Sequence, residues 1–168
     1  AEHKPVFAHP QNMTGVDTVI AAGVDVMAHT VPGAPGYSEP QLAKFKQQGI
    51  ALIPTLSLFA NIPGAGPEMS ARLVASTVAQ LKAFSDNGGS VLFGTDVGFT
   101  SLYDTTLEYE LMHRALSERQ VLASLTTNPA QYFKAAKKGR VEQGLDADLV
   151  VLDGDPLSDV RNLAKVAY

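Results

Sequence analysis

The sequence contains no cysteine in its 168 residues. This absence excludes disulfide bonds, thiolate nucleophiles and cysteine-ligated zinc, so any bound metal has to be held by histidine, aspartate or glutamate. It leaves the compartment undecided, because a cysteine-free chain is compatible with both the cytoplasm and the periplasm.

The sequence also lacks an excess of positive charge and a long apolar run. Its 13 Lys and Arg residues against 17 Asp and Glu residues give a formal net charge of −4, which argues against nucleic-acid binding and against a polybasic membrane contact. No segment reaches the roughly 18 apolar residues of a membrane-spanning helix. With 45% apolar and 18% charged residues, the composition is that of a soluble globular domain.

An initiator methionine and a signal peptide are missing as well, since the chain opens Ala-Glu-His-Lys-Pro. At the other end, Val166-Ala167-Tyr168 has the pattern of a strand that stops midway. We therefore expect a fragment that is truncated at both ends.

What is present is an alternation of short apolar runs with longer amphipathic stretches. The apolar runs predict strands at residues 6–8, 24–28, 50–53 and 91–93. The stretches between and after them predict helices at residues 14–22, 38–48, 68–87, 107–115, 118–125 and 128–137. This alternation favours βα units with a parallel sheet, and consecutive apolar positions are typical of strands covered on both faces.

Capping residues mark several helix boundaries. The predicted N-terminal caps are Thr14, Ser38, Ser117 and Asn128, and the predicted stops are Gly23 and Gly49. A loop rich in proline and glycine is expected before the long helix at 68–87. Beyond the last helix, the Leu149–Leu152 run indicates β structure outside the alternating pattern. We therefore divide the chain into domains at residues 1–137 and 138–168.

Three of the four apolar runs end in a residue that can bind a metal: His9, His29 and Asp96. The carboxyl ends of parallel strands gather at one face of a sheet or barrel, so these side chains are expected to share one mouth. Two imidazoles and a carboxylate suit a divalent metal, with zinc the first candidate, and such a metal lowers the pKa of bound water to about 7. Each residue alone has an ordinary explanation as a loop histidine or a helix cap, but their equivalent positions favour the metal.

The two other histidines are weaker candidates for metal ligands. His3 precedes the first predicted strand and is expected to be exposed. His113 lies inside a predicted helix, where a surface or supporting role is favoured over metal ligation.

These motifs, in this order, resemble the amidohydrolase superfamily, particularly its branch of imidazolonepropionase-like and prolidase-like enzymes. The resemblance is carried by Val-Phe-Ala-His9, Val-Met-Ala-His29-Thr, Pro54-Thr55-Leu56, Phe-Gly-Thr-Asp96, Thr-Asn-Pro-Ala130 and the segment from Gly139 to Leu152. They are similar to the ends of the family's strands 5 to 8, to the helix that follows and to the return into a small β-sandwich domain. The resemblance covers essentially the whole chain.

Two features of that family are absent. The sequence has no His-x-His pair, which the family carries on its first strand. No lysine follows a suitable strand, where many members place a carboxylated lysine that bridges two metals. The resemblance therefore implies an α/β fold made of half of a (β/α)8 TIM-type barrel, equivalent to strands 5 to 8, followed by part of the β-sandwich.

The function implied by the resemblance is hydrolysis of amide, peptide or cyclic C–N bonds in a small-molecule substrate by a metal-activated water. On this interpretation His9, His29 and Asp96 bind one or two divalent metal ions, and Asp96 is also the catalytic residue that transfers the proton. Loop residues are candidates for substrate binding, against the alternative of ordinary packing, and these are Tyr37, Phe59, Phe99 and Tyr103. The chain alone is expected to be incomplete and inactive.

Two other interpretations stay open. Four βα units cannot close an eight-stranded barrel, so the edge strands are expected to pair with a missing N-terminal half or with another copy. This need for a partner also suits a non-catalytic half-barrel that serves in binding or assembly. A sugar-phosphate-binding half-barrel ranks last, because it needs a glycine-rich phosphate loop and Asp96 would repel the phosphate.

Overall fold

The computed structural model describes residues 4–101 and 103–168, so His3 lies outside the described residues. In this part of the chain the strands form a parallel three-stranded sheet in the order β1-β2-β3. They are β1 (Phe7–Ala8), β2 (Val26–Ala28) and β3 (Ala51–Ile53). The register places Phe7 opposite Val26, and Val26 opposite Ala51. The strands expected at the first three apolar runs are confirmed in shorter form.

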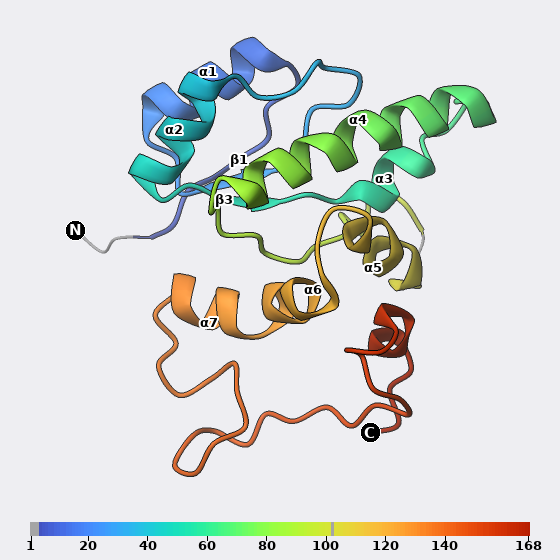
Figure 1. Ribbon diagram of the computed structural model, residues 1–168. Coiled ribbons are helices and arrows are strands. Elements are labelled where there is room, and N and C mark those ends of the chain that lie inside the picture. The colour runs from blue at the N-terminus through green and yellow to red at the C-terminus, as the bar shows by residue number, and fades with distance from the viewer. Residues whose placement is uncertain (1–3, 102) are drawn as a thin grey trace.

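Helices lie on two sides of this sheet. They are α1 (Met13–Ala22), α2 (Glu39–Gln48), α3 (Leu56–Ala60), α4 (Pro67–Asp86), α5 (Thr106–His113), α6 (Glu118–Leu125), α7 (Thr127–Tyr132) and the 3-10 helix η1 (Val160–Ala164). In Figure 1, α1, α2 and α4 run along one side of the strands, whereas α6 and α7 lie on the other side. The molecule is therefore an α/β fold with a small parallel sheet, as the alternation in the sequence predicted.

The fourth apolar run, residues 91–93, forms one parallel bridge instead of the expected strand. Val91 pairs with Leu52, and the Leu92 amide donates to the Leu52 carbonyl oxygen at 2.8 Å. One residue later, the Phe93 amide donates to the carbonyl oxygen of Ser124 in α6 at 3.1 Å. Because this amide is bonded to a helix, the ladder beside β3 ends after a single pair.

The two serine caps are confirmed, and the cap of the first helix is corrected. Ser38 and Ser117 each form a capping box, in which the serine hydroxyl accepts from a backbone amide three residues later. The predicted cap Thr14 was wrong, because α1 already begins at Met13. Its cap is Asn12, whose Oδ1 accepts from the Gly15 amide at 2.8 Å. At the other end, Gly23 adopts the expected left-handed conformation, with φ of 65°.

The last α-helix differs from its prediction at both ends. Helix α7 begins at Thr127 and ends at Tyr132, whereas a helix from Asn128 to about residue 137 was expected. Asn128 does not cap the helix, because its side-chain amide donates to the Val91 carbonyl oxygen at 2.9 Å. The helix cannot continue past Phe133, because Lys134 adopts a left-handed φ of 56°.

A second difference is α3, which occupies residues 56–60 where a loop was expected. This helix has only five residues, and Thr55 makes no side-chain cap to it. Its first two amides are instead bonded by the carboxylate of Glu108, from α5. The two residues are 52 positions apart, so the sequence around α3 could not predict this contact.

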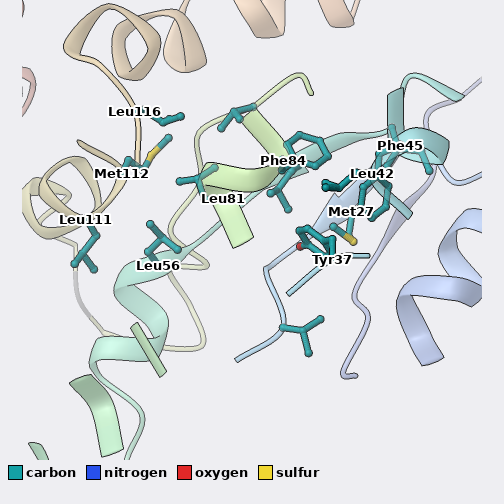
Figure 2. Packing of buried hydrophobic residues seen from close by; sticks show 14 of the residues in the cluster. Met27, Tyr37, Leu42, Phe45, Leu56, Leu81, Phe84, Leu111, Met112 and Leu116 are labelled. Carbon is teal, nitrogen blue, oxygen red and sulfur yellow. The ribbon is translucent and has the colours of Figure 1, made fainter. Parts of the chain in front are cut away.

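The hydrophobic core lies on both faces of β2 and β3, as the apolar runs predicted. Met27 and Leu52 belong to the large cluster that Figure 2 shows in part, together with side chains of α2 and α4. The alternate residues Val26 and Ala51 face the other way and form a small cluster with Leu92, covered by Ile53 and Tyr132. Strand β1 is the exception, because Phe7 at the end of the sheet is 50% exposed.

The C-terminal segment, residues 138–168, contains little regular structure. The predicted β run at 149–152 contributes one antiparallel bridge, between Leu152 and Val166. The segment is held to the rest of the molecule through η1, whose Val160 is 4% exposed and belongs to the large cluster. Figure 1 shows η1 next to α5. A domain boundary at residue 137 stays a prediction.

Within the described ranges, no helix combines the length and the apolar character that crossing a membrane demands.

Candidate active site

Two of the three predicted metal ligands lie at neighbouring strand ends, the third follows the bridge beside β3, and the three meet in pairs. His9 directly follows β1 and His29 directly follows β2, and their ring centroids are 4.4 Å apart at an angle of 73°. His29 Nε2 lies 3.9 Å from Asp96 Oδ2, which follows the fourth apolar run. His29 is therefore the side chain that joins the other two. Among the described residues, no three His, Asp or Glu side chains converge as a complete metal-binding group.

The backbone at these strand ends is strained in a repeated way. His29, Thr55 and Asp96 all have left-handed φ values, of 70°, 49° and 57°. Residues other than glycine seldom adopt this region, and for the β-branched Thr55 it is a true outlier. Strained backbone of this kind persists where the surrounding structure imposes it, and it clusters at functional sites. The same conformation after β2, after β3 and after the bridge at Val91 thus points to a common site.

The His29 ring is buried and bonded on one side. It is 7% exposed, and its Nδ1 lies 2.5 Å from Thr55 Oγ1. Burial is the main cause that lowers the pKa of His29 below 6.5, and the nearby His9 lowers it further, while Asp96 acts in the opposite direction. The neutral imidazole is thus favoured, and a neutral imidazole has one nitrogen lone pair available for a metal.

Two buried polar side chains hold the turns that carry this arrangement. Gln80 of α4 bonds both backbone groups of Val31, with Nε2 donating to the carbonyl oxygen at 2.6 Å and Oε1 accepting from the amide at 2.8 Å. Glu108 of α5 accepts from the amides of Leu56 and Ser57 at 2.9 and 2.6 Å. Gln80 thus fixes the chain two residues after His29, and Glu108 fixes it directly after Thr55.

Sequence reasoning missed both of these residues. Each lies on the apolar stripe of its helix: Gln80 is next to Leu81, and Glu108 is three residues before Leu111. A polar residue on a buried stripe was the signal that could have found them, because such a group has to be hydrogen-bonded. Burial raises the pKa of Glu108 above 4.5, although the two amides that bond it act in the opposite direction.

The four candidates for substrate binding lie in two kinds of environment. Tyr37 is in the core, with its ring packed edge-on against Phe45 at 5.1 Å (Figure 2), and no described residue bonds its hydroxyl. Phe59 in α3 is 5% exposed. Phe99 and Tyr103 are 70% and 81% exposed. Tyr37 and Phe59 are therefore buried, whereas Phe99 and Tyr103 lie at the surface, and the role of all four in substrate binding stays a prediction.

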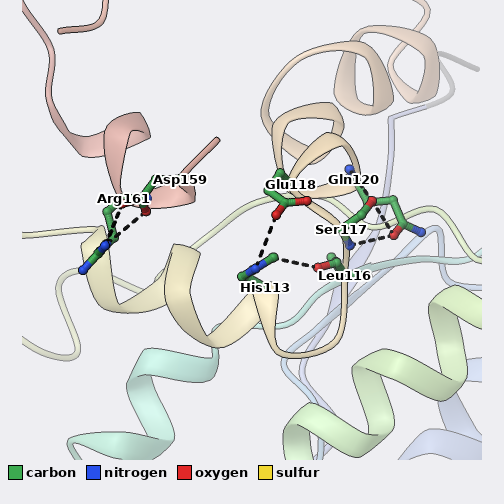
Figure 3. A network of polar contacts seen from close by, with 7 residues as sticks. All are labelled: His113, Leu116, Ser117, Glu118, Gln120, Asp159 and Arg161. Carbon is green, nitrogen blue, oxygen red and sulfur yellow. Dashed lines mark hydrogen bonds and ion pairs between the residues drawn. The ribbon is translucent and has the colours of Figure 1, made fainter. Parts of the chain in front are cut away.

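An open cavity of about 650 Å³ lies between the start of α5 and η1. Its lining includes Tyr103, Asp104 and Arg161, but neither His29 nor Asp96. The guanidinium of Arg161 is paired with the carboxylate of Asp159 at 2.7 Å (Figure 3). This cavity is separate from the strand-end site.

His113 belongs to the connection between α5 and α6. Its Nδ1 donates to the Leu116 carbonyl oxygen at 3.1 Å, and its Nε2 lies 3.6 Å from Glu118 Oε1 (Figure 3). Both ring nitrogens are therefore occupied by neighbouring residues of the same turn. This placement agrees with the expected supporting role.

Comparison with known proteins identifies the family. The profile of the Amidohydrolase family matches residues 4–167. The chain belongs to this family. The resemblance inferred from the order of the strand-end motifs is thereby confirmed.

Individual amidohydrolases are similar over nearly the whole chain. The ochratoxinase of Aspergillus niger is 23% identical over 95% of this chain, and its crystal structure superposes with a TM-score of 0.75. The crystal structure of a Xaa-Pro dipeptidase with bound methionine covers 96% of the chain at 23% identity, with a TM-score of 0.79. The chain spans 35% of the length of the ochratoxinase sequence and 42% of the dipeptidase structure. The fold thus matches part of an amidohydrolase barrel.

Proposed function

We propose that this chain is part of a metal-dependent hydrolase of amide, peptide or cyclic C–N bonds, with His9, His29 and Asp96 as its metal-binding residues. One observation carries the proposal: the buried His29 presents Nε2 to the carboxylate of Asp96 at 3.9 Å, with the ring of His9 beside it. A neutral imidazole and a carboxylate that face each other at this distance are two electron donors, and a divalent cation between them satisfies both.

The donor set fits zinc in kind and nearly fits it in spacing. Two ligand atoms on a tetrahedral zinc, each about 2.1 Å from the metal, are about 3.4 Å apart. The distance of 3.9 Å between His29 Nε2 and Asp96 Oδ2 needs a closure of about half an ångström to reach that value. We propose that further ligands come from polypeptide outside these 168 residues, either the N-terminal part of a longer chain or a second copy.

The chemistry follows from the exposure of each side chain. A bound divalent metal supplies a polarised carbonyl and a water whose pKa is lowered to about 7. The Asp96 side chain is 39% exposed, so its carboxylate would be accessible to the attacking water and could accept a proton from it. Asp96 could then donate this proton to the leaving nitrogen, which would be general acid–base catalysis. His29, with 9% of its side chain exposed, stays in place as a ligand.

The substrate class is supported by the relatives. The similar dipeptidase is named for cleaving a peptide bond, which is an amide. Tyr37, Phe59, Phe99 and Tyr103 remain our candidates for contacts with a small-molecule substrate. The exposed rings of Phe99 and Tyr103 are available for such contacts, whereas Phe59 would require a movement of α3.

A non-catalytic assembly module is the second candidate function. It is favoured by the open edge of β1, where Val6 and Phe7 are 55% and 50% exposed. An edge strand that carries exposed apolar side chains is a template for pairing with another polypeptide. Both candidate functions require a partner polypeptide, so association does not distinguish them. Metal binding does, because only the hydrolase requires it.

Metal content tests the hydrolase. The purified chain is loaded with zinc, freed of excess metal and analysed for elements, beside Asp96→Ala and a control, Asp86→Ala, whose carboxylate pairs with Lys82 on the surface of α4. We expect about one zinc per chain in the wild type and the control, and little in Asp96→Ala. Zinc that stays in Asp96→Ala would contradict the assignment of Asp96. Absence of zinc from all three proteins would show that these side chains do not hold the metal without the further ligands, and activity would then have to be sought in a longer protein.

A further inference from the structure

We propose that Thr55 is a positioning residue of the site: its hydroxyl accepts the Nδ1 proton of His29 and thereby leaves Nε2 as a free lone pair toward Asp96. The role of the free Nε2 lone pair as a metal ligand rests on the proposed metal-dependent function. The position of the proton itself is a property of this chain alone and can be measured without metal.

The hydrogen bonds of Thr55 determine the direction of this contact. A hydroxyl has one proton, and Thr55 Oγ1 donates it to the Pro54 carbonyl oxygen at 2.9 Å, a group that can only accept. The contact of 2.5 Å between Thr55 Oγ1 and His29 Nδ1 then has to use the proton of the imidazole. A neutral imidazole carries one N–H, so Nε2 of His29 is left without a proton.

The opposite arrangement leaves a group poorly satisfied. If the hydroxyl proton pointed to Nδ1, the imidazole proton would be on Nε2. Its acceptor there is Asp96 Oδ2 at 3.9 Å, which is beyond hydrogen-bond distance. Since His29 is 7% exposed, an N–H without a close acceptor is costly. The structure therefore favours the proton on Nδ1.

The conformation of Thr55 shows that its place is imposed by its surroundings. Its φ and ψ are 49° and 50°, a region in which a β-branched residue is strained, and the residue is 2% exposed. Glu108 holds the next two backbone amides, those of Leu56 and Ser57. On the other strand, the His29 amide donates to the Ile53 carbonyl oxygen at 2.8 Å. The strained turn thus aims the hydroxyl at His29.

Removal of the hydroxyl is expected to move the proton. Without Thr55 Oγ1, the strongest nearby acceptor for the imidazole is the carboxylate of Asp96, on the Nε2 side. A proton on Nε2 occupies the lone pair that a metal needs. Histidine ligands in metal sites generally donate their second nitrogen to an oxygen acceptor, and loss of that acceptor typically costs 10–100-fold in metal affinity.

The test compares Thr55→Val, which keeps the branched shape without a hydroxyl, with Thr55→Ser, which keeps the hydroxyl. Long-range 1H–15N correlation spectra of the metal-free proteins, at a pH where the imidazole is neutral, show which nitrogen carries the proton. The spectrum of His29→Gln identifies the His29 signal. We expect the proton on Nδ1 in the wild type and in Thr55→Ser, and on Nε2 in Thr55→Val. A wild-type proton on Nε2, or an unchanged proton in Thr55→Val, would overturn the proposal.

Zinc affinity, measured by competition with a chelating dye, separates this proposal from the proposed function. We expect Thr55→Val to bind zinc about 10–100-fold more weakly than the wild type, and Thr55→Ser to bind it about equally well. Equal affinity in the wild type and Thr55→Val would overturn the positioning role. Absence of zinc binding throughout, with the expected proton positions, would contradict the metal-dependent function and support the role of Thr55 in setting the tautomer. If Thr55→Val does not fold, the wild-type spectrum still decides the proton's position.

Discussion

At the scale of single residues, His29 connects the candidate site. Its ring contacts His9, its Nε2 faces Asp96, and its Nδ1 is bonded to Thr55. Each of these contacts joins the end of β2 to a different segment of the chain. A change at His29 should therefore affect the site more than a change at any other histidine.

We predict that His29→Ala lowers zinc affinity by at least about 100-fold, because the variant loses both a proposed metal ligand and the hydrogen bond of that ligand to Thr55. His113→Ala is the matched control, since His113 contacts Leu116 and Glu118 and lies outside the site. The control should bind zinc like the wild type and lose about 1 kcal/mol of stability. Isothermal titration with zinc and urea unfolding give the two quantities, and equal zinc affinities in both variants would contradict the assignment of His29.

Gln80 provides a second prediction at this scale. In Gln80→Leu, the buried amide and carbonyl of Val31 lose their partners, and each unsatisfied group costs about 1–3 kcal/mol. We expect the free energy of unfolding to fall by about 2 kcal/mol or more. Gln48→Leu, at an exposed position of α2, should change it by less than about 0.5 kcal/mol. Urea unfolding measures both, and equal effects would show that the clamp on Val31 contributes nothing.

At the scale of secondary-structure elements, the helices depend on contacts at their ends. Helix α1 is capped by Asn12, and α3 is held by a carboxylate from another helix. Two measurements test these ends, one by substitution and one by pH.

The cap of α1 distinguishes two adjacent candidates. Asn12→Ala removes the acceptor for the Gly15 amide and should cost about 1 kcal/mol. Thr14→Ala, inside the first turn, should cost nothing or stabilise slightly, since alanine is the better helix former. Thermal unfolding by circular dichroism ranks the two variants, and a larger loss in Thr14→Ala would restore the cap expected from the sequence.

Glu108 should give the protein a distinctive dependence on pH. Because burial raises the pKa of Glu108 in the folded state above 4.5, the folded protein holds this proton more tightly than the unfolded chain does. The contribution of this tighter proton binding to the free energy of unfolding is thus fully present below pH 4.5. It is lost as the pH rises through the raised pKa of Glu108. We expect the stability of the wild type relative to Glu108→Gln to decrease over that window. Urea unfolding of both proteins across the window measures this, and a difference that grows with pH would refute it.

At the scale of the whole molecule, the open edge of β1 is the main liability. β1 lies at the end of the sheet order, and the exposed Phe7 stacks on Phe133 at 6.4 Å between ring centroids. An exposed strand edge with apolar side chains favours pairing with another polypeptide. The isolated chain is therefore expected to associate.

We predict that sedimentation velocity finds assemblies larger than a monomer, and that Phe7→Lys shifts the distribution toward monomer. A charge on an edge strand opposes pairing, which is the physical reason for the shift. Phe99→Lys is the control, because Phe99 is 70% exposed and lies outside the three strands. A monomeric wild type at high concentration would contradict association through β1.

The sequence determined by itself those features that depend on neighbouring residues. The first three apolar runs located the strands, and the predicted caps Ser38 and Ser117 located the starts of α2 and α6, because capping is a contact within one turn. The placement of His9 and His29 at strand ends followed from the same runs, whereas Asp96 follows a run that forms only one bridge. The order of these motifs identified the family. Their role as metal ligands stays a prediction.

The tertiary structure decided what depends on residues far apart in the chain. Thr55 contacts His29 across 26 positions, Gln80 reaches Val31 across 49, and Glu108 starts α3 from 52 positions away. No local periodicity encodes such pairs, since they form only after the helices have packed on the sheet. For the same reason Tyr37, which its loop suggested as a pocket residue, is found packed against Phe45 in the core. Burial of the apolar surface of the Tyr37 ring favours this position in the core.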